Sequence, residues 1–446
     1  MPIRTLLILF ACFATAQPQA IHIPDTSAGT ALQAWLEAFN AADTARLEAY
    51  ATKYRKGPTG SVDATLAFRK QTGGFELLEI VQGESGQLAF RVKEFASPTV
   101  AIGKIDMTTD EPPTVKHFVL RAVPPGVAAS AMLLRIETAT RERLVDAVIS
   151  QMNENYVFPE TAKKVEATFR VRQKAGAYNE ADADSFAELL TEDLQKLTND
   201  KHLRVNFFPM VLPKEEPQRS PDVDTPQMQT WLKRANCGFE KADILPSNIG
   251  YLKFNSFFNP IFCGATASAA MGFLDNVDAL IFDLRDNGGG DPKMVAFIST
   301  YLFNDSTHLD DIYNRKENST TQYWTLPYVP VNRLPATPVF VLTSKRTFSG
   351  AEEFSYNLKA LKRATIVGEV TGGGAHPTQG HRLDDHFQID VPFARGVNPV
   401  TQTNWEGTGV EPDVKVDASQ ALEVAIKLAT ERIKENASKS QPVRLP

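Results

Sequence analysis

At residues 338–354 the chain reads PVFVLTSKRTFSGAEEF. The apolar run from Pro338 to Thr343 predicts a buried strand. The residues after it predict a helix, because apolar side chains recur at the spacing of one helix face: Ala351, Phe354, Leu358 and Leu361. Ser349 lies at the turn between strand and helix, where its hydroxyl would project into a cleft at the carboxyl end of a sheet and the first helical amides would point at an oxyanion. Ser349 is therefore a candidate nucleophile.

The same serine also has a purely structural interpretation. Ser349 would cap the helix, and Glu352, three residues later, would complete a capping box. The choice between a cap and a nucleophile therefore depends on the rest of the chain.

Strands and helices alternate on both sides of this stretch. An apolar strand is predicted at 279–284, and a further strand at 365–367. A helix is predicted between them from the apolar face of Val295, Ile298 and Leu302. Such alternation is typical of βαβ units with a largely parallel sheet, so the fold class predicted for residues 248–436 is α/β.

A glycine-rich loop, Asp286 to Gly290, directly follows the first of these strands. Its glycines allow a tight turn and a close approach to a ligand, and the amides of Gly288 and Gly289 are candidates for half of an oxyanion hole. The alternative is a simple strand-to-helix loop. A phosphate-binding loop is disfavoured, because no Lys-Ser/Thr pair follows and the glycine spacing misses the dinucleotide fingerprint.

A serine nucleophile needs a base to take its proton, and the base needs an acid to orient it. Two of the seven histidines are candidates for the base. His202 lies in a polar turn between a predicted helix and a strand, whereas His376 follows the glycines of 372–374. From chemistry alone the two compete, because His376 is nearer to Ser349 in sequence.

The residues before the α/β region predict two further units and a linker. Residues 24–123 combine an amphipathic helix with several short alternating strands, which predicts a small α+β domain that resembles the cone-shaped nuclear-transport-factor-like fold. Residues 138–208 predict a helical segment ending in the turn that holds His202. Residues 209–247 predict an exposed linker, and residues 437–446 a disordered tail.

Several motifs of the α/β region occur together in the order found in the C-terminal-processing (tail-specific) serine protease family, which the chain resembles: FDLRDNGGG (282–290), TSKRTFSGAEEF (343–354), IVGEVTGGG (366–374) and GTGVEPDV (407–414). Two more motifs are similar to the branch that includes interphotoreceptor retinoid-binding protein and tricorn-protease cores: ENYVFPE (154–160) and NDKHLRV (199–205). The resemblance covers about residues 140–434. It implies a crotonase-like (ClpP/crotonase-type) protease core behind the helical segment and the small N-terminal domain.

Two departures from the tail-specific pattern decide which catalytic groups the resemblance implies. The lysine of a Ser–Lys dyad is absent, because its Gly-Lys-Gly turn reads Gly373-Gly374-Ala375 here. Residues 206–248 are also too few and too polar to hold the PDZ domain of tail-specific members. Tricorn-like members use a Ser–His–Glu arrangement instead, and its histidine and glutamate map onto His202 and Glu406.

The resemblance then implies a role for each group. Ser349 attacks the scissile carbonyl, His202 accepts the serine proton, and Glu406 holds the imidazole. The amide of Gly350, together with that of Gly288 or Gly289, holds the oxyanion. Two further residues are possible auxiliary groups: Glu352 and His376.

Composition and the N-terminus bear on partners and location. The net charge is −6 and no block rich in Lys or Arg is present, so nucleic acid is not an expected partner. Residues 1–20, MPIRTLLILFACFATAQPQA, predict a signal peptide with an Ala-x-Ala site, and hence a periplasmic or extracellular protein. A lipoprotein site at Cys12 is disfavoured by Phe10, and no later apolar segment is long enough to predict a transmembrane span.

Cys237 and Cys263 remain after signal removal, and two cysteines in an exported protein predict a disulfide. The alternative is two unrelated buried thiols. Neither cysteine has a neighbouring Cys or His at metal-ligand spacing, so neither a metal site nor another cofactor is expected.

The leading interpretation is an exported serine endopeptidase that acts on polypeptides through an acyl-enzyme. One alternative is a non-catalytic binding protein for apolar or lipid-like ligands, which the retinoid-binding relatives permit. Another is an esterase with the same triad, which the absence of a Gly-x-Ser-x-Gly motif disfavours.

Overall fold

The computed structural model divides the chain into two compact units, residues 1–133 and 134–446. It describes residues 21–55, 62–84, 86–124, 126–180, 182–214 and 225–439. The predicted signal peptide lies outside the described residues. None of the helices in the described ranges is both long enough and apolar enough to cross a membrane.

The first unit is a small α+β domain. Its helices are α1 (Ser27–Ala41), α2 (Thr44–Tyr54) and α3 (Val62–Thr72), and its strands are β1 (Phe75–Glu84), β2 (Gln87–Glu94), β3 (Val100–Met107) and β4 (Val115–Ala122). The strands pair in chain order as one antiparallel sheet. Trp35 of α1 packs against Phe39, Phe75 and Phe118, so the buried face of the helix meets the buried face of the sheet. The 3₁₀ turn Ala129–Leu133 ends this unit.

The helical segment opens the second unit. It consists of α4 (Thr138–Asn155), α5 (Pro159–Lys174) and α6 (Ala183–Thr198), followed by β5 (Arg204–Phe207). β5 pairs with β14 (Phe387–Pro392), which pairs in turn with β13 (Thr378–Arg382). The three helices and this sheet share one hydrophobic core, in which Phe186 of α6 meets Phe387 of β14. β5 is therefore joined to residues 180–186 positions later, and the turn between α6 and β5 is fixed by that pairing.

A six-stranded sheet forms the centre of the second unit. Its order is β16 (Val414–Lys415), β12 (Ala364–Gly368), β11 (Val339–Thr343), β8 (Ala279–Asp283), β7 (Ile249–Phe254) and β6 (Phe239–Leu245). All neighbours run parallel except β6 and β7. The predicted α/β class of the core is confirmed.

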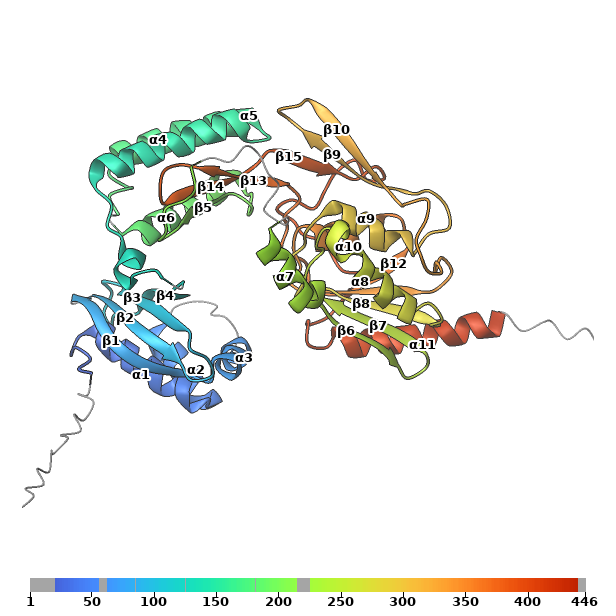
Figure 1. Ribbon diagram of the computed structural model, residues 1–446, viewed down its shortest axis with the longest axis horizontal. Helices are drawn as coiled ribbons and strands as arrows, with labels where there is room; N and C mark the ends of the chain where they lie inside the picture. Colours follow the sequence, from blue (N-terminus) through green and yellow to red (C-terminus); the bar gives the residue numbers. More distant parts are fainter. Residues whose placement is uncertain are drawn as a thin grey trace, which may run out of the picture. The chain divides into compact units, whose positions relative to one another are not determined.

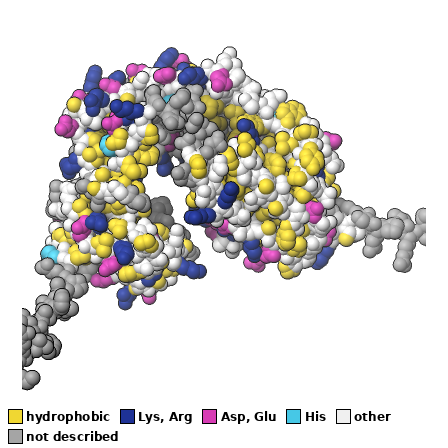
Figure 2. Space-filling model, in the orientation of Figure 1, with side chains coloured by type: hydrophobic (Ala, Val, Ile, Leu, Met, Phe, Trp, Pro, Cys, Tyr) yellow, Lys and Arg dark blue, Asp and Glu magenta, His cyan; other side chains and the backbone are white. Residues whose placement is uncertain are grey.

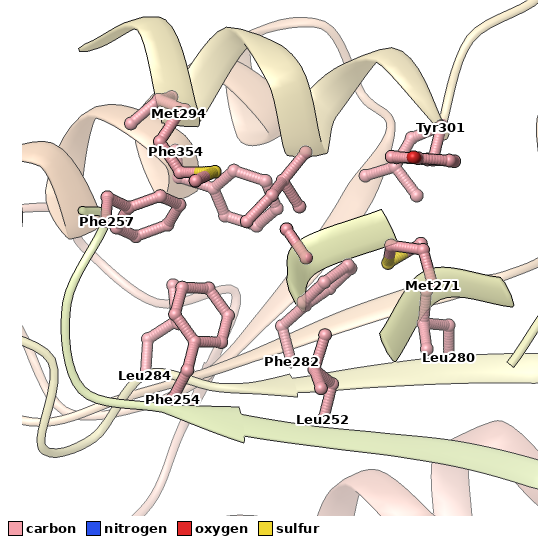
Figure 3. Close-up of a cluster of buried hydrophobic side chains, with 14 of the residues drawn as sticks. Leu252, Phe254, Phe257, Met271, Leu280, Phe282, Leu284, Met294, Tyr301 and Phe354 are labelled. Carbon is pink, nitrogen blue, oxygen red and sulfur yellow. The ribbon is translucent and has the colours of Figure 1, made fainter. Parts of the chain in front are cut away.

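Helices cover both faces of this sheet, as Figure 1 shows. The face shared by α8 (Pro260–Phe273), α9 (Pro292–Thr300) and α10 (Gly350–Ala360) holds the largest hydrophobic cluster, whereas α11 (Ala421–Lys439) packs on the other face. In Figure 3, side chains rising from the strands, such as Phe254 and Phe282, meet Phe354 of α10 and Met294 of α9. Helix α10 is thus held against the sheet directly behind the turn that carries Ser349. α11 continues to Lys439, which extends it into the predicted tail.

The structure differs from the expected linker at 209–247. Residues 225–247 include α7 (Pro226–Arg234), a 3₁₀ turn (Asn236–Gly238) and β6, which is the edge strand of the main sheet. Proline and charge concentrate before this stretch, and Thr225 caps α7 by accepting from the Met228 amide. Cys237 and Cys263 form a disulfide with Cα atoms 5.6 Å apart, which is the pairing expected from the sequence.

The second unit contains a further three-stranded sheet that the sequence did not predict. It consists of β9 (His308–Asn314), β10 (Ser319–Trp324) and β15 (Ala394–Val397). Most side chains of β10 are exposed, so this strand lacks the apolar alternation by which half-buried strands are recognised.

The surface in Figure 2 shows Lys and Arg side chains interspersed with Asp and Glu side chains. No continuous basic area gathers on the described part of this face. In a chain of net charge −6, this distribution lacks the electrostatic footprint of nucleic-acid binding on the face shown.

Candidate active site

Ser349 occupies a strained turn between β11 and α10. Its backbone has φ 52° and ψ −121°, a region that costs a non-glycine residue about 1–3 kcal/mol. Sharp strand-to-helix turns of this kind expose the serine of a nucleophile elbow. The sequence lacks the usual Gly-x-Ser-x-Gly signature of such an elbow, but the backbone adopts an equivalent conformation. The turn therefore presents Ser349 at the N-terminus of α10, with its side chain at the carboxyl end of a parallel strand.

Glu352 fixes this turn from within the helix. One carboxylate oxygen, Oε2, accepts from the Ser349 amide at 2.9 Å and from the Gly374 amide at 2.8 Å. The other, Oε1, accepts from the Gly373 amide at 2.6 Å and from the Thr371 hydroxyl. Burial raises the pKa of Glu352, although these hydrogen bonds oppose the shift. A single buried carboxylate thus ties the turn that carries Ser349 to residues 371–374, which follow β12.

His202 lies next to the turn that carries Ser349. Its ring centroid is 4.7 Å from that of Phe348, the residue immediately before Ser349. A Cβ atom placed on Gly374 would lie only 2.5 Å from His202 Cε1, so glycine is needed there for the imidazole to fit. Burial lowers the pKa of His202 to about 4, which keeps the ring neutral at neutral pH. Among the described residues, no hydrogen bond joins His202 to Ser349.

Asp200, two residues before His202, is the centre of a buried hydrogen-bond network. Its Oδ1 accepts from the His202 amide at 3.1 Å and lies 3.9 Å from His202 Nδ1. Its Oδ2 is 2.7 Å from His376 Nδ1 and accepts from the Tyr156 hydroxyl at 3.2 Å. The side chain is only 1% exposed, so these bonds hold it in one orientation.

Glu406 belongs to the same network. Its Oε2 accepts from the Ala375 amide at 2.5 Å and lies 3.3 Å from His376 Nδ1. Burial, followed by the nearby charge of Asp200, raises the pKa of Glu406 to about 7. The structure therefore places Glu406 beside His376 through a short contact, whereas the sequence analysis expected it to hold His202. No hydrogen bond between Glu406 and His202 occurs in the described part of the chain.

His376 has a supporting position in the structure. Its imidazole is 3% exposed, contacts both carboxylates through Nδ1, and packs edge-on against Phe158. Its Nε2 is buried and has no hydrogen-bond partner in the described residues. His376, which is nearer to Ser349 in sequence, thus bridges Asp200 and Glu406, whereas His202 contacts Phe348, the residue before Ser349.

The predicted oxyanion donors separate into two groups. The Gly288 amide already donates to the Asn255 carbonyl at 3.1 Å, and the Gly289 amide to Asn287 Oδ1 at 2.9 Å. Within the described ranges, the amides of Gly350 and Gly290 have no such partner. A Cβ atom on Gly350 would lie 3.0 Å from the Gly290 nitrogen, so these two amides come from adjacent backbone.

Sequence reasoning missed three members of this site: Asp200, Tyr156 and Gly290. Asp200 and Tyr156 both lie within motifs quoted above, at 199–205 and 154–160. Their contact spans more than 40 positions and depends on how the helical segment folds, so no local pattern reveals it.

Two family models match the chain, both from residue 128 onward. The model of peptidase family S41 matches residues 248–416. A model described as the N-terminal domain of this peptidase family in eukaryotic IRBP matches residues 128–234. The two models follow one another in the order expected from the motifs.

Among curated proteins, the chloroplastic C-terminal processing peptidase of Tetradesmus obliquus is 29% identical over 181 residues, which cover 38% of this chain and 35% of the relative. The chloroplastic carboxyl-terminal-processing peptidase 2 of Arabidopsis thaliana is 28% identical over 173 residues, covering 37% of this chain and 31% of the relative. A putative tricorn protease homolog 2 of Streptomyces coelicolor is 27% identical over 179 residues, covering 37% of this chain and 14% of the relative. The chain thus spans about a third or less of these relatives.

Solved structures give a weaker similarity. A putative peptidase from Parabacteroides merdae matches with a TM-score of 0.46 and 19% identity, over 65% of this chain and 96% of that one. The tricorn protease matches with a TM-score of 0.43 and 12% identity, over 80% of this chain and 47% of that one.

Proposed function

We propose that the chain, which matches the model of peptidase family S41 over residues 248–416 and that of its N-terminal domain over residues 128–234, is an exported serine peptidase that cleaves polypeptides through an acyl-enzyme. The observation that carries the proposal is the strained turn at Ser349, with the neutral His202 packed against the preceding residue. A mere helix cap does not require a positive φ, since caps normally adopt extended backbone.

In the proposed first step, the Ser349 Oγ attacks the scissile carbonyl carbon and its proton passes to His202. The low pKa of His202, about 4, keeps the imidazole unprotonated and available as the base. The imidazolium then gives the proton to the leaving amine, which departs and leaves an ester on Ser349. Water, deprotonated by the same imidazole, hydrolyses that ester.

We propose Glu406 as the acid that stabilises the charged form of His202, with Asp200 beside it. One ligand atom of each carboxylate and one ring nitrogen of His202 lie within 4.8 Å of one another. Catalytic hydrogen bonds are often longer without substrate and shorten when it binds. His376, which contacts both carboxylates, holds them in place.

The oxyanion donors in this proposal are the amides of Gly350 and Gly290. The free amide of Gly350 lies at the N-terminus of α10, where the helix dipole favours negative charge. Gly288 and Gly289, whose amides are already used, instead shape the loop. Loss of one such donor typically costs about 3–4 kcal/mol of transition-state stabilisation.

Export rests on the signal peptide at residues 1–20 and is supported by the disulfide between Cys237 and Cys263, since disulfides persist in oxidising compartments. The periplasm or the extracellular space is the proposed location. Antibody detection in cell fractions, with the N-terminus of the mature protein sequenced, tests it. An intact N-terminus on cytosolic protein would exclude export.

The central experiment compares the wild type with Ser349→Ala on unfolded casein, a peptide library, a small ester and a fluorescent fatty ligand. We expect peptide cleavage by the wild type, and at least a 10³-fold loss in the variant with unchanged circular dichroism. A fluorophosphonate probe should label the wild type at Ser349 only. Peptide cleavage that survives in Ser349→Ala would reject the mechanism. Fatty-ligand binding without cleavage or labelling would favour the non-catalytic alternative.

A further inference from the structure

One cluster beside the proposed nucleophile has the composition of a metal site. Asp200, His202 and Glu406 each offer one ligand atom, and these atoms all lie within 4.8 Å of one another. The residues come from two distant segments, the turn after α6 and the segment before β16. One imidazole and two carboxylates form a donor set that suits a small divalent transition metal.

Two atoms of this cluster are buried without a hydrogen-bond partner in the described residues: His202 Nδ1 and Glu406 Oε1. The nearest charged neighbour of Nδ1, Asp200 Oδ1, is 3.9 Å away, which is too far for a hydrogen bond. Buried polar atoms are almost always satisfied by protein, water or an ion. The two unsatisfied atoms therefore indicate a binding position for a small polar species. This observation is independent of the residue types in the cluster.

The other oxygen of each carboxylate, Asp200 Oδ2 and Glu406 Oε2, already takes part in hydrogen bonds on the side away from the proposed site. Asp200 Oδ2 is bonded to Tyr156 and His376, and Glu406 Oε2 to the Ala375 amide. Metal ligands are typically oriented by such outer hydrogen bonds, which leave the inner oxygen free to coordinate. Asp200 Oδ1 accepts only one amide, so a second lone pair is available.

We propose that Asp200, His202 and Glu406 bind one Zn²⁺ ion, and that zinc inhibits the peptidase rather than serving as its cofactor. Zinc accepts His and carboxylate ligands at about 2.0–2.2 Å, so the three atoms need to move together by only about an ångström to surround it. Mg²⁺ and Ca²⁺ are less suited, because they prefer oxygen ligands alone.

Inhibition of the peptidase follows because zinc would occupy Nδ1 of His202. This part of the proposal rests on the proposed function. A metal on Nδ1 takes the position of the proton that the base must keep while Nε2 receives the serine proton. The bound cation also opposes a second positive charge on the same ring. With zinc in place, His202 cannot become an imidazolium, and Ser349 loses its base.

Binding is measured first, without any assay of activity. The full-length protein is treated with a chelator, titrated with ZnCl₂ by isothermal calorimetry, and loaded with Co²⁺ for a visible spectrum. We expect one Zn²⁺ per chain with micromolar or tighter affinity and a tetrahedral Co²⁺ spectrum. His202→Ala and Glu406→Gln should each weaken binding by at least about 10- to 100-fold, which is the loss typical of removing even an outer partner of a metal ligand. His308→Ala is the matched control, because it removes another histidine paired with a carboxylate, at 2.8 Å from Asp311, and should bind zinc as the wild type does.

The variants also separate this proposal from the catalytic one. Ser349→Ala should bind zinc with unchanged affinity, since the serine is not a ligand. Zinc that binds with this affinity but leaves peptide cleavage by the wild type unchanged would support the site and reject the inhibition. Absence of zinc binding, or equal binding in the wild type, His202→Ala and Glu406→Gln with all three folded by circular dichroism, would overturn the site.

Discussion

Among single residues, Ser349 has the least favourable backbone for its type in the proposed site. A positive φ disfavours any side chain with a Cβ atom, and Ser349 adopts it with φ 52°. The contacts of Glu352 keep it there, because the amide of Ser349 is bonded to a carboxylate that the rest of the loop also holds. Strain of this kind persists where function needs it and structure over-determines it.

This strain leads to a prediction about two variants of the same residue. Ser349→Gly and Ser349→Ala should both be inactive, but Ser349→Gly should be more stable than Ser349→Ala by about 1 kcal/mol. Relief of the strain outweighs the added flexibility of glycine in the unfolded chain. Chemical denaturation of both proteins measures the difference. Equal or lower stability of the glycine variant would show that the turn is not strained.

The raised pKa of Glu406 predicts the acid side of the pH profile. Glu406 carries its charge only above about pH 7, because burial and then Asp200 raise its pKa, whereas His202 stays neutral down to about pH 4. The wild-type kcat/KM should therefore fall as the pH drops through 7, when the carboxylate becomes protonated and can no longer stabilise the imidazolium.

Glu406→Gln should lower kcat/KM by about 10²–10⁴-fold and move its acid limb toward pH 4, because only His202 then titrates. Rate profiles between pH 4 and 9 for both proteins check this. An acid limb that stays near pH 7 in the variant would assign the titration to another group.

The site could be predicted from sequence only where its chemistry lies within local motifs. Ser349 and His202 stand in recognisable turns, so their approach was expected. The bridge from Asp200 through His376 to Glu406 was not, because it joins three segments, and a sequence pattern carries no information on which buried carboxylate an imidazole meets. The hydrogen bonds that the amides of Gly288 and Gly289 donate within the protein likewise depend on the loop geometry and could not be predicted.

At the scale of elements, the site lies where the loop after β8 passes against the first turn of α10. A Cβ atom on Gly289 would lie 2.6 Å from the Gly350 nitrogen and 2.8 Å from Ser349 Cβ. The loop and the helix therefore touch through backbone, and no side chain fits between them.

This contact makes two neighbouring glycines unequal. Gly289→Ala should reduce kcat by at least about 10²-fold, because the added methyl group displaces the nucleophile turn and the φ of +95° disfavours alanine. Gly288→Ala should be close to wild type, since its Cβ atom would meet nothing within 4 Å. Steady-state kinetics and thermal melts of both variants provide the comparison. Similar kinetics in the two variants would contradict the close packing.

Elements with strong periodic burial were predictable and the others were not. β8 and β11 are buried at every position and stood out as apolar runs. α2 and β10 could not be recognised in this way, because each buries at most a few apolar residues. Their structure depends on tertiary contacts, which the local sequence does not reveal. The end of the linker was misjudged for the same reason, because β6 is an edge strand with mostly exposed or half-buried side chains.

At the scale of the whole molecule, the two units have separate hydrophobic cores. Phe90 is fully buried in the first unit, and Phe186 is fully buried in the core that positions the turn of His202. Each of these side chains should contribute about 3–5 kcal/mol to the unit that contains it.

Phe90→Ala should therefore lower the midpoint temperature at which the first unit unfolds and leave kcat on a short peptide unchanged. Phe186→Ala should lower the midpoint temperature at which the second unit unfolds. It should also reduce kcat, because the core that contains Phe186 supports β5 and with it His202. Scanning calorimetry with a parallel peptide assay distinguishes the two. Loss of activity in a folded Phe90→Ala protein would show that the first unit takes part in catalysis.

The pairing of β5 with β14 has a consequence for biosynthesis. The turn that carries His202 is made early on the ribosome, but the strand that fixes it and the acid at Glu406 are among the last parts of the domain to emerge. A nascent or truncated chain that already contains Ser349 would still lack the strand that positions His202, its proposed base. The proposed peptidase would thus stay inactive until its synthesis is nearly complete, because the residues that position its proposed base are made after Ser349.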